Sequence, residues 1–235
     1  MNASVPSHAV GGSAGNLAAE RAAQRVALSV GPLVGNDVVD LRDPDASAER
    51  EPRFDARVFD EAERALIEQS SRPARTRWQL WACKEAAYKA VVRRAPQTVF
   101  SPSQFRVSLY APSKPDGEVS LRGTVRTPVG ELSVAVREEH GAIHALASGD
   151  PARLVAGMTR VAMDPADPQA PSASLRRFVQ EQLYEQLAVE PSQVEIRKRG
   201  RIPELWVRGR RRLDISLSHH GEMVAFACEA PDGCL

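Results

Sequence analysis

Apolar and polar positions alternate along the middle of the chain. Apolar side chains recur at every second position in four short runs: residues 105–109, 119–125, 132–136 and 143–147. Clusters of turn-forming residues separate these runs: 112–117, 128–130 and 140–141. A period of two, interrupted by such turns, predicts an antiparallel meander between residues 103 and 148.

Three elements are predicted before the meander. Residues 33–41 predict a strand that contains both apolar and acidic positions. Residues 60–70 predict a helix, and a second helix follows Pro73 and includes residues 76–92. The second helix is apolar on most of its sides, which is typical of a buried helix.

Charges are rare in this second helix. After Arg77 they are Lys84, Glu85 and Lys89, and the apolar surroundings lead us to expect that they face an internal site. Arginine outnumbers lysine along the chain, yet half of the lysines lie within this short stretch. An ammonium differs from a guanidinium as a phosphate ligand and proton donor, which favours a specific role for lysine here.

A second unit of similar composition follows. It begins with a helix capped by Ser172 or Ser174, whose apolar face comprises Leu175, Phe178, Val179, Leu183 and Leu187. Strands are predicted near four segments: residues 194–197, 205–207, 213–217 and 223–228. Both units combine helix with antiparallel sheet, so the predicted fold class is α+β.

The predicted domain organisation has four parts. Residues 1–32 form an N-terminal extension that is expected to be disordered, apart from a short helix within residues 16–28, because residues 1–15 are rich in Ser, Gly and Ala and carry no charge. The rest divides into a first half, a Pro- and Asp-rich linker and a second half: residues 33–150, 151–171 and 172–235.

Composition narrows the classes of function. The chain has 235 residues, of which 43% are hydrophobic and 26% charged, as is ordinary for a globular protein. A formal net charge of +1 gives no general attraction for polyanions, so any attraction for phosphates is local. The sequence predicts neither a membrane span nor a secretory signal. Three cysteines without metal-ligand spacing predict a reduced, cytoplasmic protein.

Two carboxylates are candidate ligands of a divalent metal ion. Asp37 lies in the first predicted strand near Gly35, whose missing side chain allows close approach of another group. Together with Glu85 of the buried helix it would supply two ligands to one Mg²⁺, with water and a substrate phosphate completing the octahedron. The alternative is an ordinary i,i+4 salt bridge between Glu85 and Lys89, which the apolar surroundings disfavour.

A polar turn near the C-terminus is a candidate phosphate site. Residues 216–221 read Ser-Leu-Ser-His-His-Gly, and hydroxyls, imidazoles and free backbone N–H groups at a strand end bind phosphate. A polar turn without function is the alternative. The chain lacks the Gly-x-Ser-x-Gly elbow of a serine nucleophile, and it lacks both a Walker loop and a Gly-x-Gly-x-x-Gly loop.

Basic residues are concentrated just before this turn. They are Arg197, Lys198, Arg199, Arg201, Arg208, Arg210, Arg211 and Arg212. The cluster is compatible with a phosphorylated ligand, an acidic protein partner or a solvated hairpin. Nucleic acid is disfavoured because Trp206 is the one aromatic residue interleaved with these charges.

Five short segments form one pattern when they are taken together. They are Gly35-Asn36-Asp37-Val38-Val39-Asp40-Leu41, Phe59 with Glu63, Trp81-Ala82-Cys83-Lys84-Glu85-Ala86-Ala87-Tyr88-Lys89, Gly200 to Pro203, and Ser216-Leu217-Ser218-His219. This pattern resembles the 4′-phosphopantetheinyl transferase superfamily over most of residues 33–228. The pairing of Gly-x-Asp with Trp-x-x-Lys-Glu-Ala-x-x-Lys at this spacing is highly specific.

The resemblance implies a reaction and its participants. The chain would bind coenzyme A and Mg²⁺ and transfer phosphopantetheine to a serine of an apo acyl or peptidyl carrier protein, releasing 3′,5′-ADP. Asp37 and Glu85 match the metal ligands, Glu85 is also a candidate base, and Lys89 matches the pyrophosphate contact. The residues expected to bind coenzyme A are Lys84, Lys89, Arg201, Ser218 and His219. No nucleic acid or membrane partner is expected.

Two departures from the larger members of the superfamily bear on architecture. Val39 replaces the glutamate of their Asp-x-Glu motif, and the segment from Gly200 to Pro203 is longer than the usual Gly-Lys-Pro, which leaves the role of Arg201 open. The motif order is that of the short holo-acyl-carrier-protein synthase type, but the chain is longer than that type. We therefore expect a 4′-phosphopantetheinyl transferase-like fold of two similar halves, a monomeric pseudo-dimer with the halves in swapped order.

Two alternatives remain at this point. Structurally, one short-type domain with a long insertion would trimerise. Functionally, a catalytically weak homologue would act as a binding or assembly module, although the retained Asp37, Glu85 and Lys89 argue against it.

Overall fold

The structure is a computed structural model, and it describes six segments of the chain: residues 33–47, 52–112, 119–151, 154–161, 170–187 and 190–229. The predictions for residues 1–32, the extension and its short helix, lie outside the described residues. No helix in the described segments is both long enough and apolar enough to cross a membrane.

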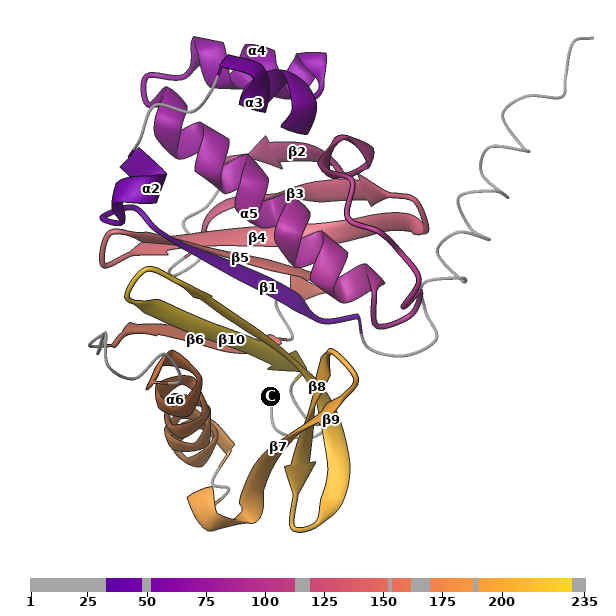
Figure 1. Cartoon of the computed structure of the whole chain (residues 1–235), viewed down its shortest axis with the longest axis vertical. Coiled ribbons are helices and arrows are strands. Elements are labelled where there is room, and N and C mark those ends of the chain that lie inside the picture. Colours follow the sequence, from indigo (N-terminus) through magenta and orange to yellow (C-terminus); the bar gives the residue numbers. More distant parts are fainter. Residues whose placement is uncertain are drawn as a thin grey trace, which may run out of the picture. The chain divides into compact units, whose positions relative to one another are not determined.

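The first sheet has five antiparallel strands in the order β1-β5-β4-β3-β2. They are β1 (Gly35–Asp40), β2 (Arg106–Tyr110), β3 (Val119–Thr127), β4 (Gly130–Glu139) and β5 (Ala142–Ser148). Strands β2 to β5 are the predicted meander, and β1 pairs with the last of them (Figure 1). Strand β1 is therefore an edge strand of this sheet.

The second sheet repeats this arrangement in the order β6-β10-β9-β8-β7. Its strands are β6 (Leu154–Arg160), β7 (Val194–Arg199), β8 (Ile202–Val207), β9 (Arg210–His220) and β10 (Met223–Glu229). Strands β7 to β10 form a meander, and β6 pairs with β10 as β1 pairs with β5.

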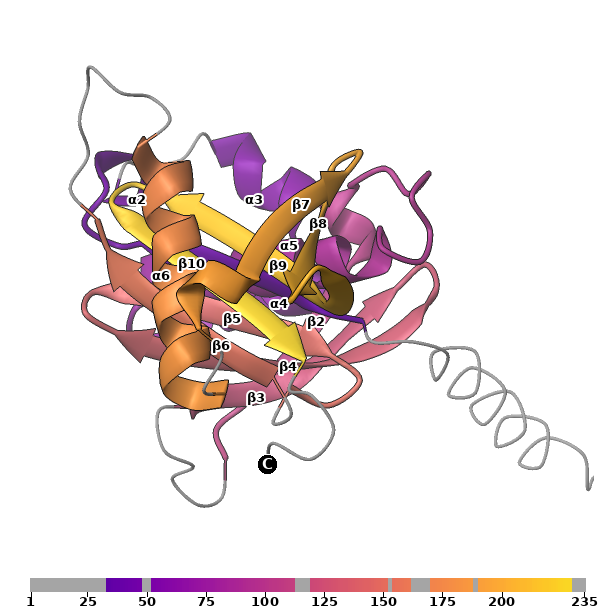
Figure 2. The same ribbon diagram turned by 90° about the horizontal axis from the view of Figure 1, so that it is seen from below.

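Helices follow the first strand of each half. In the first half they are α2 (Pro44–Ser47), α3 (Pro52–Val58), α4 (Glu61–Gln69), α5 (Pro73–Val91) and the short 3₁₀ helix η1 (Pro102–Gln104). In the second half they are α6 (Ala170–Leu187) and the 3₁₀ helix η3 (Pro191–Gln193). Helix α5 crosses the first sheet. Helix α6 covers the face of β6 and β10 that is turned away from the first sheet (Figures 1 and 2). Both 3₁₀ helices have the sequence Pro-Ser-Gln and directly precede a meander.

The predicted α+β class and the two similar halves are confirmed by this repeat. The predicted linker of residues 151–171 was not confirmed as such, because β6 lies within it and begins the second half. Prolines, aspartates and alanines around this strand obscured its short apolar run. The predicted cap of the next helix, Ser172 or Ser174, was wrong, because α6 begins at Ala170 and both serines lie inside it.

Local sequence features explain where the two longest helices of the first half begin and which face of the second is buried. Helix α4 starts with a capping box: Asp60 accepts from the backbone N–H of Glu63, and the Glu63 side chain accepts from the backbone N–H of Asp60. Helix α5 starts at Pro73, which has no N–H to leave unsatisfied in the first turn. Its alanine-rich face is buried against the first sheet, where Ala82, Ala86 and Ala90 have no exposed surface.

The halves meet along the open edge of β1. Three alternate N–H groups of this edge donate to β9 side chains: Asn36 to Ser216 Oγ at 3.0 Å, Val38 to Ser218 Oγ at 3.1 Å, and Asp40 to His220 Nδ1 at 3.2 Å. Side chains thus replace the backbone partners that an edge strand lacks. Apolar contacts, such as those among Val38, Met158 and Met223, complete the junction.

Candidate active site

Three polar side chains from three elements converge where the halves meet. Asp37 Oδ1 of β1 lies 2.7 Å from Lys89 Nζ of α5 and 2.9 Å from Ser218 Oγ of β9. The Lys89 ammonium is also 3.3 Å from the Ser218 hydroxyl. The structure therefore brings together one residue from each of the three principal motifs.

Close packing of α5 on β1 makes this convergence geometrically feasible. A Cβ atom at Gly35 would lie 1.9 Å from the carbonyl oxygen of Ala86, so only glycine allows the helix to approach this strand. Side chains alternate along β1, which turns Asp37 toward α5 on the same face as Gly35.

Ser218 is held in place by its hydrogen bonds. Its hydroxyl oxygen accepts from the backbone N–H of Val38, lies within reach of the Lys89 ammonium, and donates to Asp37. One donor and two acceptor sites are the whole capacity of a hydroxyl group, so this one is fully satisfied. Ser218 accordingly fixes the Asp37 carboxylate and the β1 backbone relative to the second half.

Glu85 precedes Lys89 by one helical turn and is half-buried. Burial raises the pKa of Glu85 to about 7, the nearby Asp37 carboxylate adds to the increase, and Lys89 opposes it. A buried carboxylate beside a second carboxylate is typical of a site for a cation.

The donor set fits a magnesium ion. Among the described residues, no group of three or more His, Cys, Asp and Glu side chains could enclose a metal by itself. Mg²⁺, however, is ordinarily held by one or two carboxylates together with water and substrate phosphates. Asp37 and Glu85 supply such a pair, since burial first and the Asp37 charge second raise the pKa of Glu85, and a bound cation would stabilise both charges.

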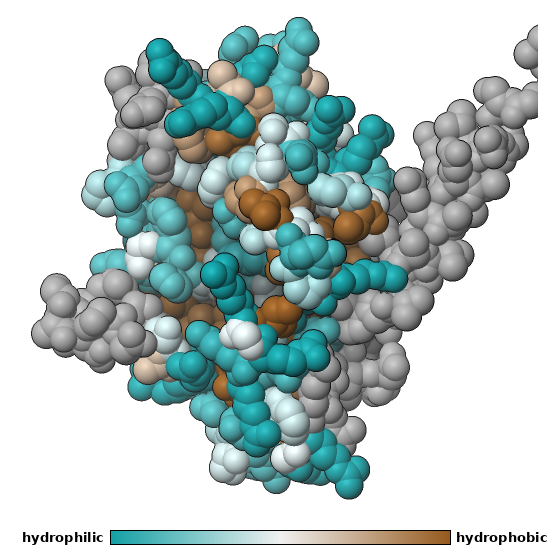
Figure 3. Space-filling model, turned by 45° about the vertical axis from the view of Figure 1, so that its right-hand side comes forward, coloured by the Kyte–Doolittle hydropathy of each residue, from teal (hydrophilic) through white to brown (hydrophobic). Residues whose placement is uncertain are grey.

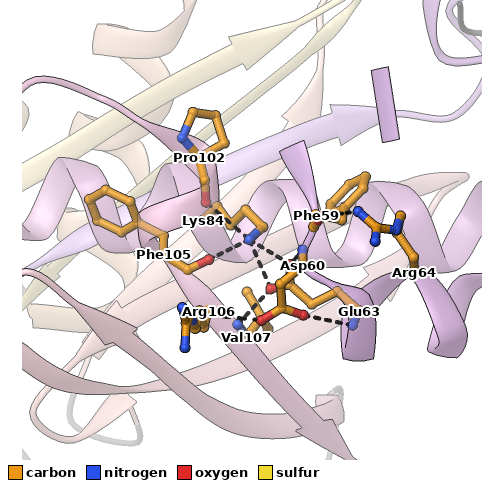
Figure 4. Close-up of polar contacts among 9 residues, drawn as sticks. All are labelled: Phe59, Asp60, Glu63, Arg64, Lys84, Pro102, Phe105, Arg106 and Val107. Atoms are coloured by element: carbon orange, nitrogen blue, oxygen red, sulfur yellow. Dashed lines mark hydrogen bonds and ion pairs between the residues drawn. The ribbon is translucent and has the colours of Figure 1, made fainter. Parts of the chain in front are cut away.

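Lys84 lies away from this cluster, although the resemblance implied that it binds coenzyme A. Its ammonium is fully buried, 2.8 Å from the Glu63 carboxylate, and donates to the carbonyl oxygens of Pro102 and Phe105 (Figure 4). Glu63 also accepts from the backbone N–H of Val107. The network joins α4 and α5 to the start of β2. Lys84 therefore stabilises the packing of these three elements.

His219 and Arg201 are exposed and lie outside the hydrogen-bonded cluster. His219 neighbours Ser218 on β9, so its side chain points to the other side of the strand. Arg201 lies in the turn between β7 and β8, next to Gly200, whose φ is 63°. No hydrogen bond or ion pair within the described segments joins either residue to Asp37, Glu85 or Lys89.

Arg93 is a residue of the junction that the sequence analysis missed. It follows α5 and donates to the carbonyl oxygens of Val34, Pro203 and Ile215, and one of its guanidinium nitrogens lies 3.6 Å from Asp214 Oδ1. It thereby ties the end of the helix and the start of β1 to β8 and β9. A pair of adjacent arginines at a helix end was the available signal, but it did not identify which of the two is buried.

Asp40 and Arg160 form a second unrecognised link between the halves. The guanidinium donates to both carboxylate oxygens of Asp40, at 2.8 and 3.0 Å, and also to Glu222. Arg160 and the backbone N–H of Arg42 hold the pKa of Asp40 below its ordinary value in spite of burial. Asp40, three residues after the Gly-x-Asp motif, thus forms an ion pair across the junction.

Comparison with known proteins gives a family match for part of the chain. Residues 33–141 match the family described as the 4′-phosphopantetheinyl transferase superfamily. This span contains Asp37, Glu85 and Lys89, so the resemblance stated from the sequence is confirmed for the half that holds the candidate metal ligands. A search of curated proteins found no match.

The chain is also similar to a solved structure, the crystal structure of holo-[acyl-carrier-protein] synthase from Thermotoga maritima. The two share 17% sequence identity, the alignment covers 76% of this chain and 83% of that chain, and the TM-score is 0.34.

Proposed function

We propose that this chain is a 4′-phosphopantetheinyl transferase, starting from the family match of its first half. The reaction would transfer 4′-phosphopantetheine from coenzyme A to a serine of an apo carrier protein and release 3′,5′-ADP. The observation that carries the proposal is the meeting of Asp37, Lys89 and Ser218 within hydrogen-bond distance at the junction of the halves, with Glu85 beside them.

The charges of the site suit a pyrophosphate substrate. Lys89 is a flexible ammonium that would pair with a phosphate oxygen, while Asp37 and Glu85 would hold Mg²⁺. When bound, the metal ion would offset negative charge on the phosphates during transfer. Lys89 lies at hydrogen-bond distance from both Asp37 and Ser218, so its ammonium is held in the site before any substrate binds.

Glu85 is the best candidate for the base. In the transfer, the serine oxygen of the carrier forms a bond to the phosphorus that bears pantetheine, and the bond to the 3′,5′-ADP oxygen breaks. The serine proton would pass to the Glu85 carboxylate. Without metal, burial beside Asp37 raises the pKa of Glu85 to about 7, and a bound Mg²⁺ would lower it again, so the carboxylate would be deprotonated and able to accept this proton at neutral pH.

One chain would suffice for one site. Asp37, Glu85 and Lys89 come from the first half and Ser218 comes from the second, so both sides of the site are present in a monomer. His219 and Arg201, both exposed on the second half, remain proposed contacts for coenzyme A. The exposed basic residues of β7 to β9 would attract an acidic carrier through screened, long-range electrostatics.

An intact-mass assay tests the proposal. Purified protein would be incubated with coenzyme A, Mg²⁺ and a panel of apo acyl and peptidyl carrier proteins, each with a control carrier in which the acceptor serine is alanine. A mass gain of one phosphopantetheine group on a native carrier, and none on its alanine control, is expected. Coenzyme A binding without any transfer across the panel would instead favour a non-catalytic binding module.

A further inference from the structure

Four aromatic rings form a continuous row next to the candidate active site. They belong to Phe54 of α3, Trp81 and Tyr88 of α5, and Phe100 of the segment after α5. Ring centroids lie 5.8 Å apart for Phe54 and Trp81, 5.8 Å for Trp81 and Phe100, and 4.8 Å for Phe100 and Tyr88. Each of the four side chains is partly exposed, so this row, the aromatic wall, reaches the molecular surface.

The aromatic wall lies on one side of Glu85, and the polar cluster lies on the other. At about 100° per residue, Trp81 is offset from Glu85 by about 40° around the axis of α5, and Tyr88 by about 60° in the same direction. Lys89, which donates to Asp37, is offset by about 40° in the opposite direction. Glu85 therefore lies between a strip of aromatic side chains and the charged groups of the candidate active site.

Val99 extends the aromatic wall into solvent. It directly precedes Phe100 in the chain and is 80% exposed. Figure 3 brings forward the side of the molecule that carries the C-terminal end of α5, and apolar residues reach the surface there among charged ones. A single exposed apolar residue is ordinary, but one that continues an aromatic row is typical of a surface that a partner covers.

Basic residues border the aromatic wall at both ends. Exposed Arg53 is the neighbour of Phe54, and exposed Arg94 follows the C-terminal end of α5. The acidic residue on the other side of Phe54, Asp55, forms an ion pair with Arg77 at 2.7 Å. An apolar strip between exposed positive charges is complementary to an acidic protein that presents apolar side chains. It is not complementary to itself in charge, which disfavours a second copy of this chain as the partner.

The proposed reaction determines which substrate approaches from this side. In phosphoryl transfer the attacking and leaving oxygens lie roughly in line, on opposite sides of the phosphorus. Lys89 and Ser218 lie on one side of Glu85 and would hold the pyrophosphate, and the departing 3′,5′-ADP would lie over the second half. The serine oxygen that attacks would then arrive from the opposite side, which is the side of the aromatic wall.

We propose that an acidic carrier protein docks on the aromatic wall and Val99 while its serine reaches Glu85. This inference rests on the proposed function and adds the surface by which the protein substrate is recognised. Apolar side chains of the carrier cover Val99 and the exposed edges of the rings, and its acidic side chains meet Arg53 and Arg94. Apolar burial at the centre of the contact supplies affinity, and the charges at its rim set the orientation.

Substitution of Val99 tests the docking surface without touching the polar cluster. Val99→Glu places a negative charge in the centre of the apolar contact and opposite an acidic partner, so the KM for apo carrier protein should rise at least about tenfold in the intact-mass assay. The kcat and the KM for coenzyme A should stay close to those of the original chain. Val99→Leu, which keeps the apolar character, should retain the original KM for the carrier.

Tyr184→Glu is the matched control, because Tyr184 is 51% exposed on α6 of the second half. Its KM for the carrier should equal that of the original chain. Thermal melting should show that both glutamate variants remain folded, since each substitution replaces an exposed side chain.

The results that would overturn the inference are distinct from one another. An unchanged KM for the carrier in folded Val99→Glu would remove the aromatic wall from the docking surface while the transferase activity stands. A KM raised for coenzyme A alone would assign the wall to the pantetheine arm, and a dimer of the original chain that Val99→Glu dissociates in sedimentation velocity would assign it to a second copy. If the original chain modifies no carrier at all, the proposed function fails and this inference fails with it.

Discussion

Asp37 Oδ1 and Ser218 Oγ lie 2.9 Å apart although they belong to opposite halves of the molecule and are 181 positions apart in the chain. The contact depends on the register between β1 and β9, in which alternate serines and a histidine satisfy the open edge of β1. Geometry at the candidate active site is therefore sensitive to changes at the junction that touch neither Asp37 nor Ser218.

Arg93 offers a test of this dependence. Arg93→Met removes hydrogen bonds to three carbonyl groups that belong to both halves, and each bond from a charged donor contributes about 1.5–3 kcal/mol. We expect the melting temperature to fall by roughly 9 °C or more and the KM for coenzyme A to rise. Differential scanning calorimetry and steady-state kinetics measure the two effects.

The neighbouring Arg94 is exposed and provides the control. Arg94→Met should leave both quantities close to those of the original chain. Equal behaviour of the two variants would contradict the assignment of Arg93 to the junction.

Glu85 should make both stability and metal binding depend on pH. Its pKa is about 7 in the folded chain against an ordinary 4.5, so the folded state retains a proton that the unfolded state loses between these values. This group therefore decreases stability as pH rises from 4.5 to 7. In the absence of metal, Glu85→Gln should raise the melting temperature at pH 8 and leave it nearly unchanged near pH 4.5.

Mg²⁺ should bind more tightly as pH rises through 7, because the ion competes with the Glu85 proton. Calorimetric titration with Mg²⁺ across this range measures the effect. Glu68→Gln on the exposed face of α4 is the control. A Mg²⁺ affinity that does not change with pH in this range would remove Glu85 from the metal site.

Substitutions of Lys84 and of Lys89 should have different effects: the first should reduce stability, and the second should reduce activity. Lys84→Met leaves the Glu63 carboxylate buried without its cation, and breaking a buried pair in this way costs about 3–5 kcal/mol of unfolding free energy. We expect a large loss of stability, with near-normal KM for coenzyme A in the fraction that remains folded. A stable Lys84→Met variant with a raised KM would restore the coenzyme role implied by the sequence.

Lys89→Arg should show the opposite pattern. A planar guanidinium does not fit between Asp37 and Ser218 as an ammonium does, so transfer should fall at least about tenfold while the melting temperature stays close to that of the original chain. Lys198→Arg, on the exposed side of β7, should be silent in the same assay. Identical kinetics for the two substitutions would contradict a specific role for the Lys89 ammonium.

The helices and meanders could be read from the sequence because their periodicity is local. The strand β6 could not, because its short apolar run lies among prolines and aspartates and acquires its identity from pairing with β10. Spacing and family resemblance predict one site for Asp37, Glu85 and Lys89; in the structure Lys89 donates to Asp37, and the charges of both act on Glu85.

The environment of the Lys84 side chain could not be predicted from the sequence. Adjacent helical residues point about 100° apart, and a helix that is apolar on most sides gives no sign of which charge faces which neighbour. The structure turns Lys84 toward α4 and Glu85 toward β1. The roles of Ser216, His220 and Arg93 depend on contacts more than 100 positions apart, which no local pattern contains.

The most direct test of the account compares Asp37→Asn with the original chain in the intact-mass assay, at matched concentrations of coenzyme A, Mg²⁺ and apo carrier protein. Asn keeps the size of the side chain but removes the charge that would hold Mg²⁺. We predict rapid, Mg²⁺-dependent addition of one phosphopantetheine group by the original chain, and a rate at least about a hundredfold lower for the folded variant. Equal rates of carrier modification by the two proteins would contradict the assignment of the reaction to this site.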